Sequence, residues 1–228
     1  MNINRRALIG GISAGLLAPA GRLMASDGGQ RRFTVYRDGA KIGSQVIDVR
    51  PGAGGGVQVA IDIELKIKVL GITAYVYTMN NRETWQGGRL TTMDSVTDDD
   101  GDRDYAKARA AGDMLEIDGS DFQGVVSGEA VSTTYWSMAF LDRRIWINTQ
   151  TGVPIEVATA RLGAGEVAGD EGPIATERWS AKGENLDIVL HYAAGEWVSV
   201  EFDAGGELAL FRPQTPTPDF ATVWADAS

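Results

Sequence analysis

The chain lacks cysteine altogether and has a single histidine, His191, among its 228 residues. Without thiols it can have no cysteine nucleophile, thiolate zinc site, iron–sulfur cluster or covalently attached haem. One imidazole also excludes a metal site built from several histidines, which leaves carboxylates and carbonyl oxygens as ligands. The sequence therefore predicts neither a cofactor nor a metal centre.

Familiar catalytic motifs are missing too. Beyond residue 25 there is no Gly-x-Ser-x-Gly nucleophile elbow. The glycine-rich stretch Pro51–Gly56 precedes a predicted strand rather than a helix, so it does not resemble a phosphate-binding loop. We assign no catalytic residue, and a non-enzymatic protein is the favoured interpretation.

Basic residues are fewer than acidic residues. The chain has 21 Lys and Arg against 31 Asp and Glu, which gives a formal net charge of −10 at pH 7. Three arginines and no acid lie in residues 1–25, so losing that segment would bring the charge to about −13. An acidic surface repels phosphates, so we expect neither nucleic acid nor anionic lipid headgroups as partners.

Residues 1–25 have the pattern of an export signal. Arg5 and Arg6 precede a mildly apolar run that is too short to span a bilayer as a helix, which needs about 20 residues. The pair resembles a twin-arginine signal, with ordinary secretion and a retained membrane-proximal segment as alternatives. Small residues allow cleavage after Ala20 or Ala25. We expect a periplasmic protein without a stable transmembrane segment after cleavage.

One segment carries the strongest fold signal. From Val57 to Val69 every odd position is apolar and most even positions are polar. This period of two predicts a strand with one buried face. Its length of about 43 Å suggests a sheet that curves. A return strand is predicted over Thr73–Trp85, so the middle of the domain should be a long antiparallel pair.

Repeated turn signals extend this pattern along residues 26–212. Asp38-Gly39 and Ala204-Gly205-Gly206 are typical of hairpin turns. We predict an all-β, mainly antiparallel domain: a single curved sheet or open barrel of about ten to twelve strands. One short helix is expected between Ser132, its cap, and Arg144. Prolines from Pro213 onward exclude a central strand, so residues 213–228 are expected to form an extended tail.

Aromatic residues supply the candidate ligand-binding set. Long curved sheets often enclose a cavity, and aromatic side chains suit its wall. Most of these side chains should belong to the core or barrel rim. The candidates for an apolar ligand site are Tyr75, Tyr77, Trp85, Tyr135 and Trp136.

Three polar features have competing interpretations. Asp98–Asp104 has the alternating carboxylates of a calcium loop, but its glycine and twelfth position do not fit, which favours a solvated hairpin tip. Glu83 is expected in a structural salt bridge with Arg82 or Arg89, although it could act as an acid. His191 is expected as an exposed strand histidine, although it could serve as a base.

Several short stretches together resemble an uncharacterised family of exported bacterial β domains. They are Phe33–Gly39 with Ile42-Gly43, Glu83–Trp85 with Gly88–Leu90, Thr97–Gly101, Tyr135-Trp136 and Asn148–Gly152. The resemblance implies no activity. It suggests a fold similar to the curved antiparallel sheets of periplasmic lipoprotein carriers, which does not fix function.

The leading hypothesis is a non-enzymatic periplasmic binding or accessory protein that holds an apolar or lipid-like ligand in a β cleft. The first alternative is a periplasmic hydrolase that uses carboxylates or His191, which would have to converge in one cleft. The second is a structural partner of another exported protein, which predicts a large exposed apolar patch.

Overall fold

The computed structural model describes residues 28–169 and 172–214. The predicted export signal therefore lies outside the described residues, as does most of the predicted tail. Sixteen strands and two 3₁₀ helices make up the described part. The domain is all-β, as the sequence predicts, and it has more strands than the expected ten to twelve.

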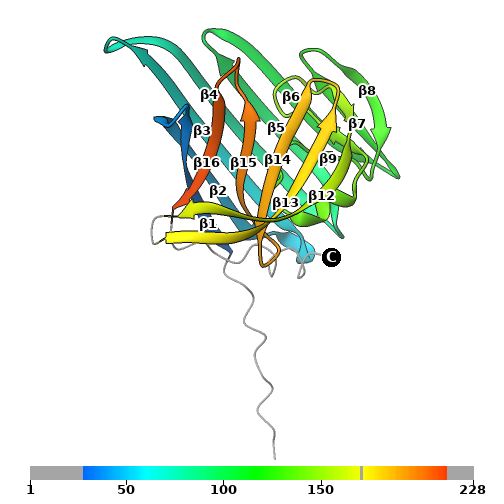
Figure 1. The fold of residues 1–228 in the computed structure, drawn as a ribbon. Helices are drawn as coiled ribbons and strands as arrows, with labels where there is room; N and C mark the ends of the chain where they lie inside the picture. The colour runs from blue at the N-terminus through cyan, green and yellow to red at the C-terminus, as the bar shows by residue number, and fades with distance from the viewer. Residues whose placement is uncertain (1–27, 170–171, 215–228) are drawn as a thin grey trace, which may run out of the picture.

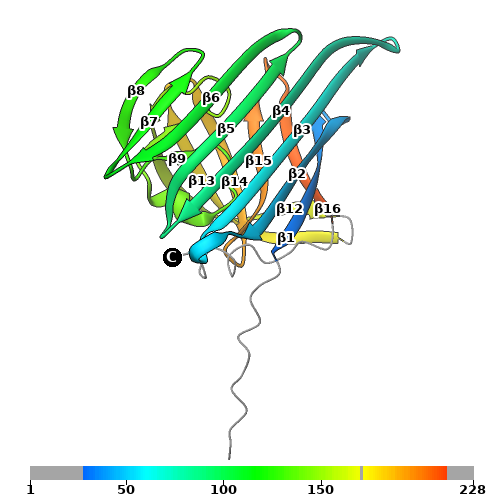
Figure 2. The ribbon, with the colours of Figure 1, turned by 180° about the vertical axis from the view of Figure 1, so that it is seen from behind.

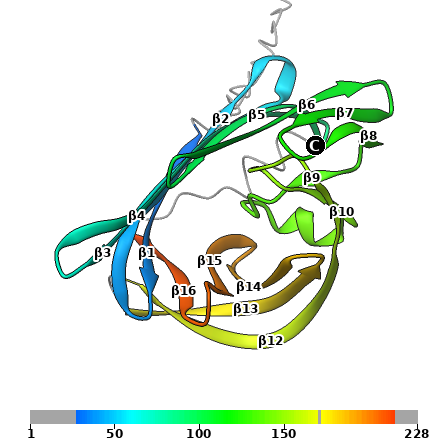
Figure 3. The ribbon, with the colours of Figure 1, turned by 90° about the horizontal axis from the view of Figure 1, so that it is seen from above.

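Thirteen strands form one antiparallel sheet in the order β12-β13-β14-β15-β16-β1-β2-β3-β4-β5-β6-β7-β8. The sheet curls into an open barrel whose edges, β8 and β12, do not pair with each other (Figure 3). The first eight strands are β1 (Gly29–Arg37), β2 (Ala40–Pro51), β3 (Val57–Val69), β4 (Ile72–Gln86), β5 (Arg89–Asp99), β6 (Asp102–Ala111), β7 (Met114–Gly119) and β8 (Gln123–Ser127). The last five are β12 (Ala158–Gly169), β13 (Gly172–Gly183), β14 (Leu186–Ala193), β15 (Glu196–Asp203) and β16 (Leu208–Gln214).

The chain between the two edges fills the gap in the barrel. It contains β9 (Val131–Ser132), the 3₁₀ helix η2 (Met138–Asp142), β10 (Ile145–Ile147) and β11 (Pro154–Glu156). These three strands form a separate small sheet in the order β11-β10-β9. Figure 3 shows the segment between β8 and β12, closing the curl of the large sheet. The other 3₁₀ helix, η1 (Ala53–Gly55), connects β2 to β3.

Strand β3 has the bounds that its alternation predicts. Val57, Val59 and Ile61 are buried on the inner face, whereas Gln58 and Glu64 are exposed on the outer face. Antiparallel pairing joins β3 to β2 along one side and to β4 along the other. The period of two in the sequence thus becomes a barrel wall with an apolar interior.

The core gathers at one end of the barrel around large aromatic side chains. Trp85 stacks on Phe140 with ring centroids 5.0 Å apart, and Trp136 meets Trp85 edge-on at 6.0 Å. Phe33 packs against Trp197 at 4.5 Å. Arg31 is fully buried beside them, where it donates to the Trp197 carbonyl and pairs with Glu196. These contacts fill this end with side chains.

The expected helix between Ser132 and Arg144 is wrong in type and extent. Only Met138–Asp142 is helical, as a 3₁₀ helix, and its cap is Ser137, whose Oγ accepts from the Ala139 amide at 3.3 Å. Ser132 lies in β9. Tyr135 has φ 53°, which interrupts any helix before it can form. The side chains between Ser132 and Arg144 therefore pack in the small sheet and the core, and they do not have the spacing of an α-helical face.

Pro213 also differs from expectation, since β16 continues through it to Gln214. Strand β15 pairs with β16 only along Leu208–Leu210, whereas β1 pairs with it as far as Gln214. Beyond Leu210 the strand therefore has a sheet partner on one side only. Proline is tolerated on such an edge, where an amide that faces away from the one paired strand makes no ladder hydrogen bond.

Within the described residues, no helix is long and apolar enough to cross a membrane.

Candidate functional site

The end of the barrel opposite the aromatic core contains a cavity of about 850 Å³. Its wall comes from β3 and β4 on one side and from β14, β15 and β16 on the other. Arg37 and Asp203, which also line it, are the last residues of β1 and β15, so the cavity reaches the end where these strands turn. Figure 1 shows this end at the top, with the β3–β4 hairpin rising beyond it.

Alternation in the sequence supplies the apolar wall. Successive inner-face residues of β3 begin in the core and continue into the cavity, because the barrel is filled only at the core end. The principal apolar residues of the lining are Ile61, Ile63, Leu65, Ile67, Ile188, Val200, Phe202 and Phe211. A cavity of this size with mostly apolar walls is typical of small-molecule sites.

Three of the five candidate aromatic residues line this cavity: Tyr75, Tyr77 and Tyr135. The first two point inward from β4, as their shared face with Met79 predicts. Tyr135 approaches from the opposite side, where its ring packs 5.9 Å from Trp146 and 6.1 Å from Trp197. The structure therefore brings these tyrosines to one chamber from two distant parts of the chain.

Trp85 and Trp136 do not reach the cavity. Their side chains are 0% and 1% exposed, and both pack on Phe140 in the aromatic core. Strand β4 places Trp85 at its far end, ten residues beyond Tyr75 on the same inner face. Their role is packing, since the core fills the space that a ligand would need.

Burial keeps the tyrosine phenols protonated. It raises the pKa of Tyr77 to about 12, with a smaller opposing effect from a hydrogen bond to Thr97. Burial likewise raises the pKa of Tyr75, where a hydrogen bond to Asp99 adds to the shift, and the pKa of Tyr135. At neutral pH the cavity wall therefore presents neutral phenols.

A polar strip along one wall was not anticipated from the sequence. It comes from the segment that closes the barrel and comprises Thr133, Thr134, Asn148, Thr149 and Gln150. The Oγ1 atoms of Thr133 and Thr149 lie 3.2 Å apart, and Gln150 Nε2 donates to Asp104 Oδ2 at 3.1 Å. In the sequence, residues 148–152 indicate only a turn. The strip gives an otherwise apolar chamber a place for the polar end of an amphipathic ligand.

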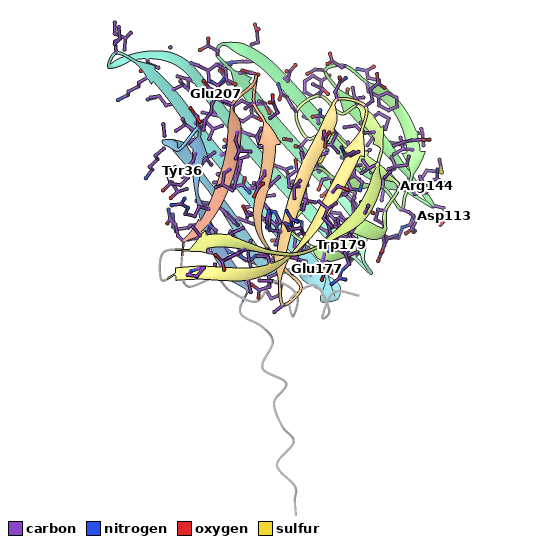
Figure 4. All side chains as sticks on the ribbon, in the orientation of Figure 1. Tyr36, Asp113, Arg144, Glu177, Trp179 and Glu207 are labelled. Atoms are coloured by element: carbon purple, nitrogen blue, oxygen red, sulfur yellow. The ribbon has the colours of Figure 1, made fainter. Side chains whose placement is uncertain are left out.

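The mouth of the cavity carries charge. Arg37 Nε lies 2.8 Å from Glu207 Oε2, and its Nη2 donates to the Ala204 carbonyl at 2.8 Å. Figure 4 shows Glu207 at the top of the molecule, beside the β15–β16 turn. This pair ties the end of β1 to the β15–β16 turn and holds the rim together.

Glu83 is not in the salt bridge that its arginine neighbours suggest. Its carboxylate is buried and accepts from Asn81 Nδ2 at 3.1 Å and Trp85 Nε1 at 2.8 Å. None of the ion pairs among the described residues includes it. Burial raises the pKa of Glu83, although hydrogen bonds from Ser132, Trp85, Asn81 and Trp136 oppose the shift. Arg82 instead pairs with Asp62 on the outer face.

His191 is buried, contrary to the expected exposed position. Its Nδ1 lies 3.0 Å from Thr176 Oγ1, and its Nε2 lies 3.0 Å from Glu201 Oε1. Burial lowers the pKa of His191 and Arg178 adds to the effect, whereas Glu201 opposes it. His191 keeps the alternation of β14, and side chains of the adjacent strands β13 and β15, Thr176 and Glu201, lie against its ring.

Asp98–Asp104 forms the β5–β6 turn, where its carboxylates bind groups of the protein. Asp98 Oδ1 accepts from the Gly101 amide at 2.9 Å, Asp100 Oδ1 from the Val76 amide at 3.3 Å, and Asp104 from Gln150. In the part of the chain that the structure describes, no group of three or more acidic or histidine side chains could hold a metal ion.

The hydrolase alternative requires Glu83, His191 and the Asp98–Asp104 cluster to converge. They do not line a common cavity: neither the inner cavity nor the hollow on the outer face is lined by His191 or by Asp98–Asp104. Glu83 lies in the core, His191 lies between β13 and β15, and the aspartates lie at a turn.

The architecture defines a class: an open antiparallel β-barrel with a packed core at one end and an apolar cavity at the other. A solved structure with a similar fold is a beta-barrel-like protein of the domain of unknown function DUF1849 from Brucella abortus, with a TM-score of 0.55 and 9% identity. The similarity covers 82% of this chain and 95% of that one. At that identity it shows a shared fold alone.

The chain belongs to the family Domain of unknown function (DUF6134), which matches residues 33–214. That range runs from β1 to the end of β16, so it includes the whole cavity and the segment that closes the barrel. This confirms the expected membership of an uncharacterised β-domain family. No curated protein matches the chain.

Proposed function

We propose that this chain is a periplasmic, non-enzymatic binding protein that holds an apolar or lipid-like ligand in the inner cavity. The observation that carries the proposal is the cavity of about 850 Å³, whose wall is apolar on β3 and on β14–β16. A concave site of that size with apolar walls can bury most of the surface of a small molecule. A ligand with an apolar body would pack against β3 and β14–β16.

The polar strip and the tyrosines define the chemistry of the ligand. Thr133, Asn148 and Gln150 offer hydrogen-bond donors and acceptors along one wall, and the neutral phenol of Tyr77 adds a donor. Few polar groups in an apolar chamber fix the orientation of a ligand. We infer an amphipathic molecule with one long apolar portion and one small polar group.

The periplasmic location in this proposal rests on the arginine pair and apolar run of residues 1–25. A domain without cysteine needs no disulfide formation in that compartment. Fusion of residues 1–25 to a reporter that is active only after export in a folded state tests the twin-arginine route. Loss of the signal when Arg5 and Arg6 are both replaced by Lys supports that route, and persistence supports ordinary secretion.

Ligand binding is tested on protein that has been denatured, delipidated and refolded. The protein is incubated with a membrane extract and examined by native mass spectrometry. We expect a discrete added mass that is retained through buffer exchange and released by organic solvent. Recovery of the unliganded mass alone, from a protein that has regained its native circular dichroism spectrum, would contradict the proposal.

A hydrolase remains a second candidate because of one observation, the sequence of contacts Thr176–His191–Glu201. A hydroxyl, an imidazole and a carboxylate in this order resemble the connectivity of a catalytic triad. All three residues lie outside both hollows, however. Thr176 and Glu201 lie on β13 and β15, on either side of His191 in β14. Chromogenic ester hydrolysis that disappears in His191→Ala would favour this candidate; no turnover by the wild type would exclude it for esters.

A partner of another exported protein is the third candidate. The outer face of β1–β7 has a hollow of about 1030 Å³ lined mainly by charged and polar side chains, among them Asp48, Arg50, Arg82, Lys107 and Glu116. Such a surface lacks the apolar patch that a stable protein interface would be expected to expose. Co-purification from intact envelopes, with and without delipidation, separates this candidate from ligand binding.

A further inference from the structure

The β3–β4 hairpin projects beyond the rest of the sheet. The pairing of β2 with β3 ends at Gly43 and Leu65, and the pairing of β5 with β4 ends at Tyr77 and Asp99. The amide and carbonyl of Val76 bond to Asp100. Nearer the tip, residues 66–75 have strand partners only within the hairpin. Figures 1 and 2 show this hairpin extending past its neighbours at the mouth end of the barrel. A two-stranded ribbon without further strands is only marginally stable in water, so this extension lacks support from the sheet.

The tip of this hairpin exposes large aliphatic side chains. Leu70 is 98% exposed and Ile72 is 74% exposed. Leu70 has φ 51° in a turn with Gly71 at φ 83°, a conformation that Asn, Asp and Gly adopt most readily. At the corresponding positive φ the chain has Asp38, Asp100 and Asn185 in three turns and the small residue Ala194 in another. Turn geometry therefore does not account for a solvent-exposed leucine at this tip.

The charge beside the tip is positive in a protein that is acidic overall. Lys66 and Lys68 are exposed on β3, and residues 65–76 contain no acidic side chain. The acids on neighbouring strands that come nearest along the sheet are Asp99 and Asp100, level with Tyr77 and Val76. Lys66 lies opposite Val76 and about 7 Å from Glu64 on the same face of β3, so its charge is partly offset. Lys68 lies about 13 Å from Glu64, beyond the screening length of about 8 Å at physiological ionic strength, so it presents its charge to a surface that the tip approaches.

The tip adjoins the mouth of the cavity. Ile67, Ala74 and Tyr75 line the cavity and lie within five residues of Leu70 along the hairpin. A surface that covers Leu70 and Ile72 would therefore lie against the opening.

We propose that the β3–β4 hairpin tip docks on the phosphate-bearing surface of a lipid bilayer, with Leu70 and Ile72 in the acyl boundary and Lys66 and Lys68 at the headgroup phosphates. Aliphatic side chains and flanking lysines are the usual elements of interfacial binding. The overall negative charge opposes approach to strongly anionic membranes, so the contact is local and reversible. With the tip docked, a ligand could pass between the bilayer and the cavity. That exchange rests on the proposed function, whereas docking itself is independent of it.

Flotation of the full-length protein with vesicles tests the docking. One set is pure phosphatidylcholine, and the other includes phosphatidylglycerol. The double variant Leu70→Asn/Ile72→Thr removes the apolar tip, and Asn suits the left-handed turn, so folding should be retained. We expect the bound fraction to fall at least tenfold with both sets, since two buried aliphatic side chains are lost. Val125→Thr, at a 55% exposed position on the β8 edge, is the matched control and should bind as the wild type does.

Lys66→Glu/Lys68→Glu separates the two sources of phosphate. We expect a loss that is larger on vesicles with phosphatidylglycerol than on pure phosphatidylcholine. Absence of vesicle binding by the wild type would overturn the proposal, and so would undiminished binding by the Leu70→Asn/Ile72→Thr variant. If the wild type does not bind vesicles, we would expect the tip to insert into a groove on a protein instead.

The same variants keep docking and ligand binding distinguishable. Fluorescent fatty acid is titrated into each delipidated protein without vesicles. The tip variant should keep wild-type affinity for the free ligand, because Leu70 and Ile72 do not line the cavity. Vesicle binding without fatty-acid binding would support docking and contradict the proposed function, and the reverse result would support the proposed function and contradict docking.

Discussion

Glu83 and Trp85, two positions apart on the inner face of β4, are joined by a hydrogen bond of 2.8 Å from Trp85 Nε1 to Glu83 Oε2. Asn81, two positions earlier, donates to the other carboxylate oxygen at 3.1 Å. The three residues place a carboxylate among neutral donors at the packed end of the barrel. Asn81 Oδ1 is buried there without a hydrogen-bond partner.

Glu83→Gln should stabilise the protein at neutral and alkaline pH. The pKa of Glu83 is raised in the folded state, so the folded protein binds more protons than the unfolded chain between the ordinary value of 4.5 and the raised one. Stability therefore falls as pH rises through that interval and stays lower above it. A glutamine amide avoids the ionisation and can donate to Asn81 Oδ1 after rotation of the Asn81 amide.

Urea denaturation at several pH values between 4 and 9 measures this effect. We expect the advantage of Glu83→Gln to grow with pH to about 1 kcal/mol, the low end of the range for a buried polar group, because the carboxylate keeps its hydrogen bonds. Glu64→Gln, at an exposed position on β3, is the control and should have the pH dependence of the wild type. Parallel curves for the wild type and Glu83→Gln would contradict the account of this carboxylate.

Arg31→Met should destabilise the barrel strongly. Arg31 is fully buried, donates to the Trp197 carbonyl and pairs with Glu196, so it joins β1 to the start of β15 across the core. Loss of one partner of a buried pair costs about 3 kcal/mol or more because the other charge is left uncompensated. Thermal unfolding should show this loss, whereas Arg32→Met, exposed on the next position, should unfold close to the wild type. Partial recovery in Arg31→Met/Glu196→Gln would identify the pair as the cause.

Tyr77 should ionise late in an alkaline titration. Burial raises its pKa from 10 to about 12, so the folded state retains a proton that the unfolded chain loses. Stability consequently falls as pH rises from about 10 to about 12, and Tyr77→Phe should lack that part of the fall. Absorbance at about 295 nm reports phenolate formation. The opposite result would be that Tyr77→Phe lacks one phenol that titrates near pH 10 in the wild type. The Tyr77 side chain would then be solvated and would not line a closed wall.

The sequence predicts the parts of this fold that depend on local pattern. The alternation of Val57–Val69 gives both bounds of β3, and it indicates that Ile63 and Leu65 point inward. It also indicates the shared face of Tyr75 and Tyr77. Their position beside an open chamber, however, depends on where the packing of the barrel ends.

Other features depend on contacts between distant segments. Trp85 and Trp136 have the same local character as the cavity tyrosines, and only their packing on Phe140 makes them core residues. His191 is buried because Thr176 of β13 and Glu201 of β15 lie against its ring. Pro213 enters the sheet because β15 pairs with β16 only as far as Leu210. No periodicity within the chain encodes these relationships.

The claim that the inner cavity binds an apolar ligand is tested most directly by filling it. Leu65 points into the cavity from β3, and its neighbour Glu64 points to solvent. Leu65→Trp and Glu64→Trp therefore add the same bulk on opposite faces of one strand. Each delipidated protein is titrated with a fluorescent fatty acid, and its thermal unfolding is recorded to confirm the fold.

We expect saturable binding by the wild type and by Glu64→Trp, and an affinity at least tenfold weaker for Leu65→Trp because the new ring occupies the ligand volume. Equal affinities for the two tryptophan variants, or no saturable binding by the wild type, would show that the inner cavity does not bind an apolar ligand.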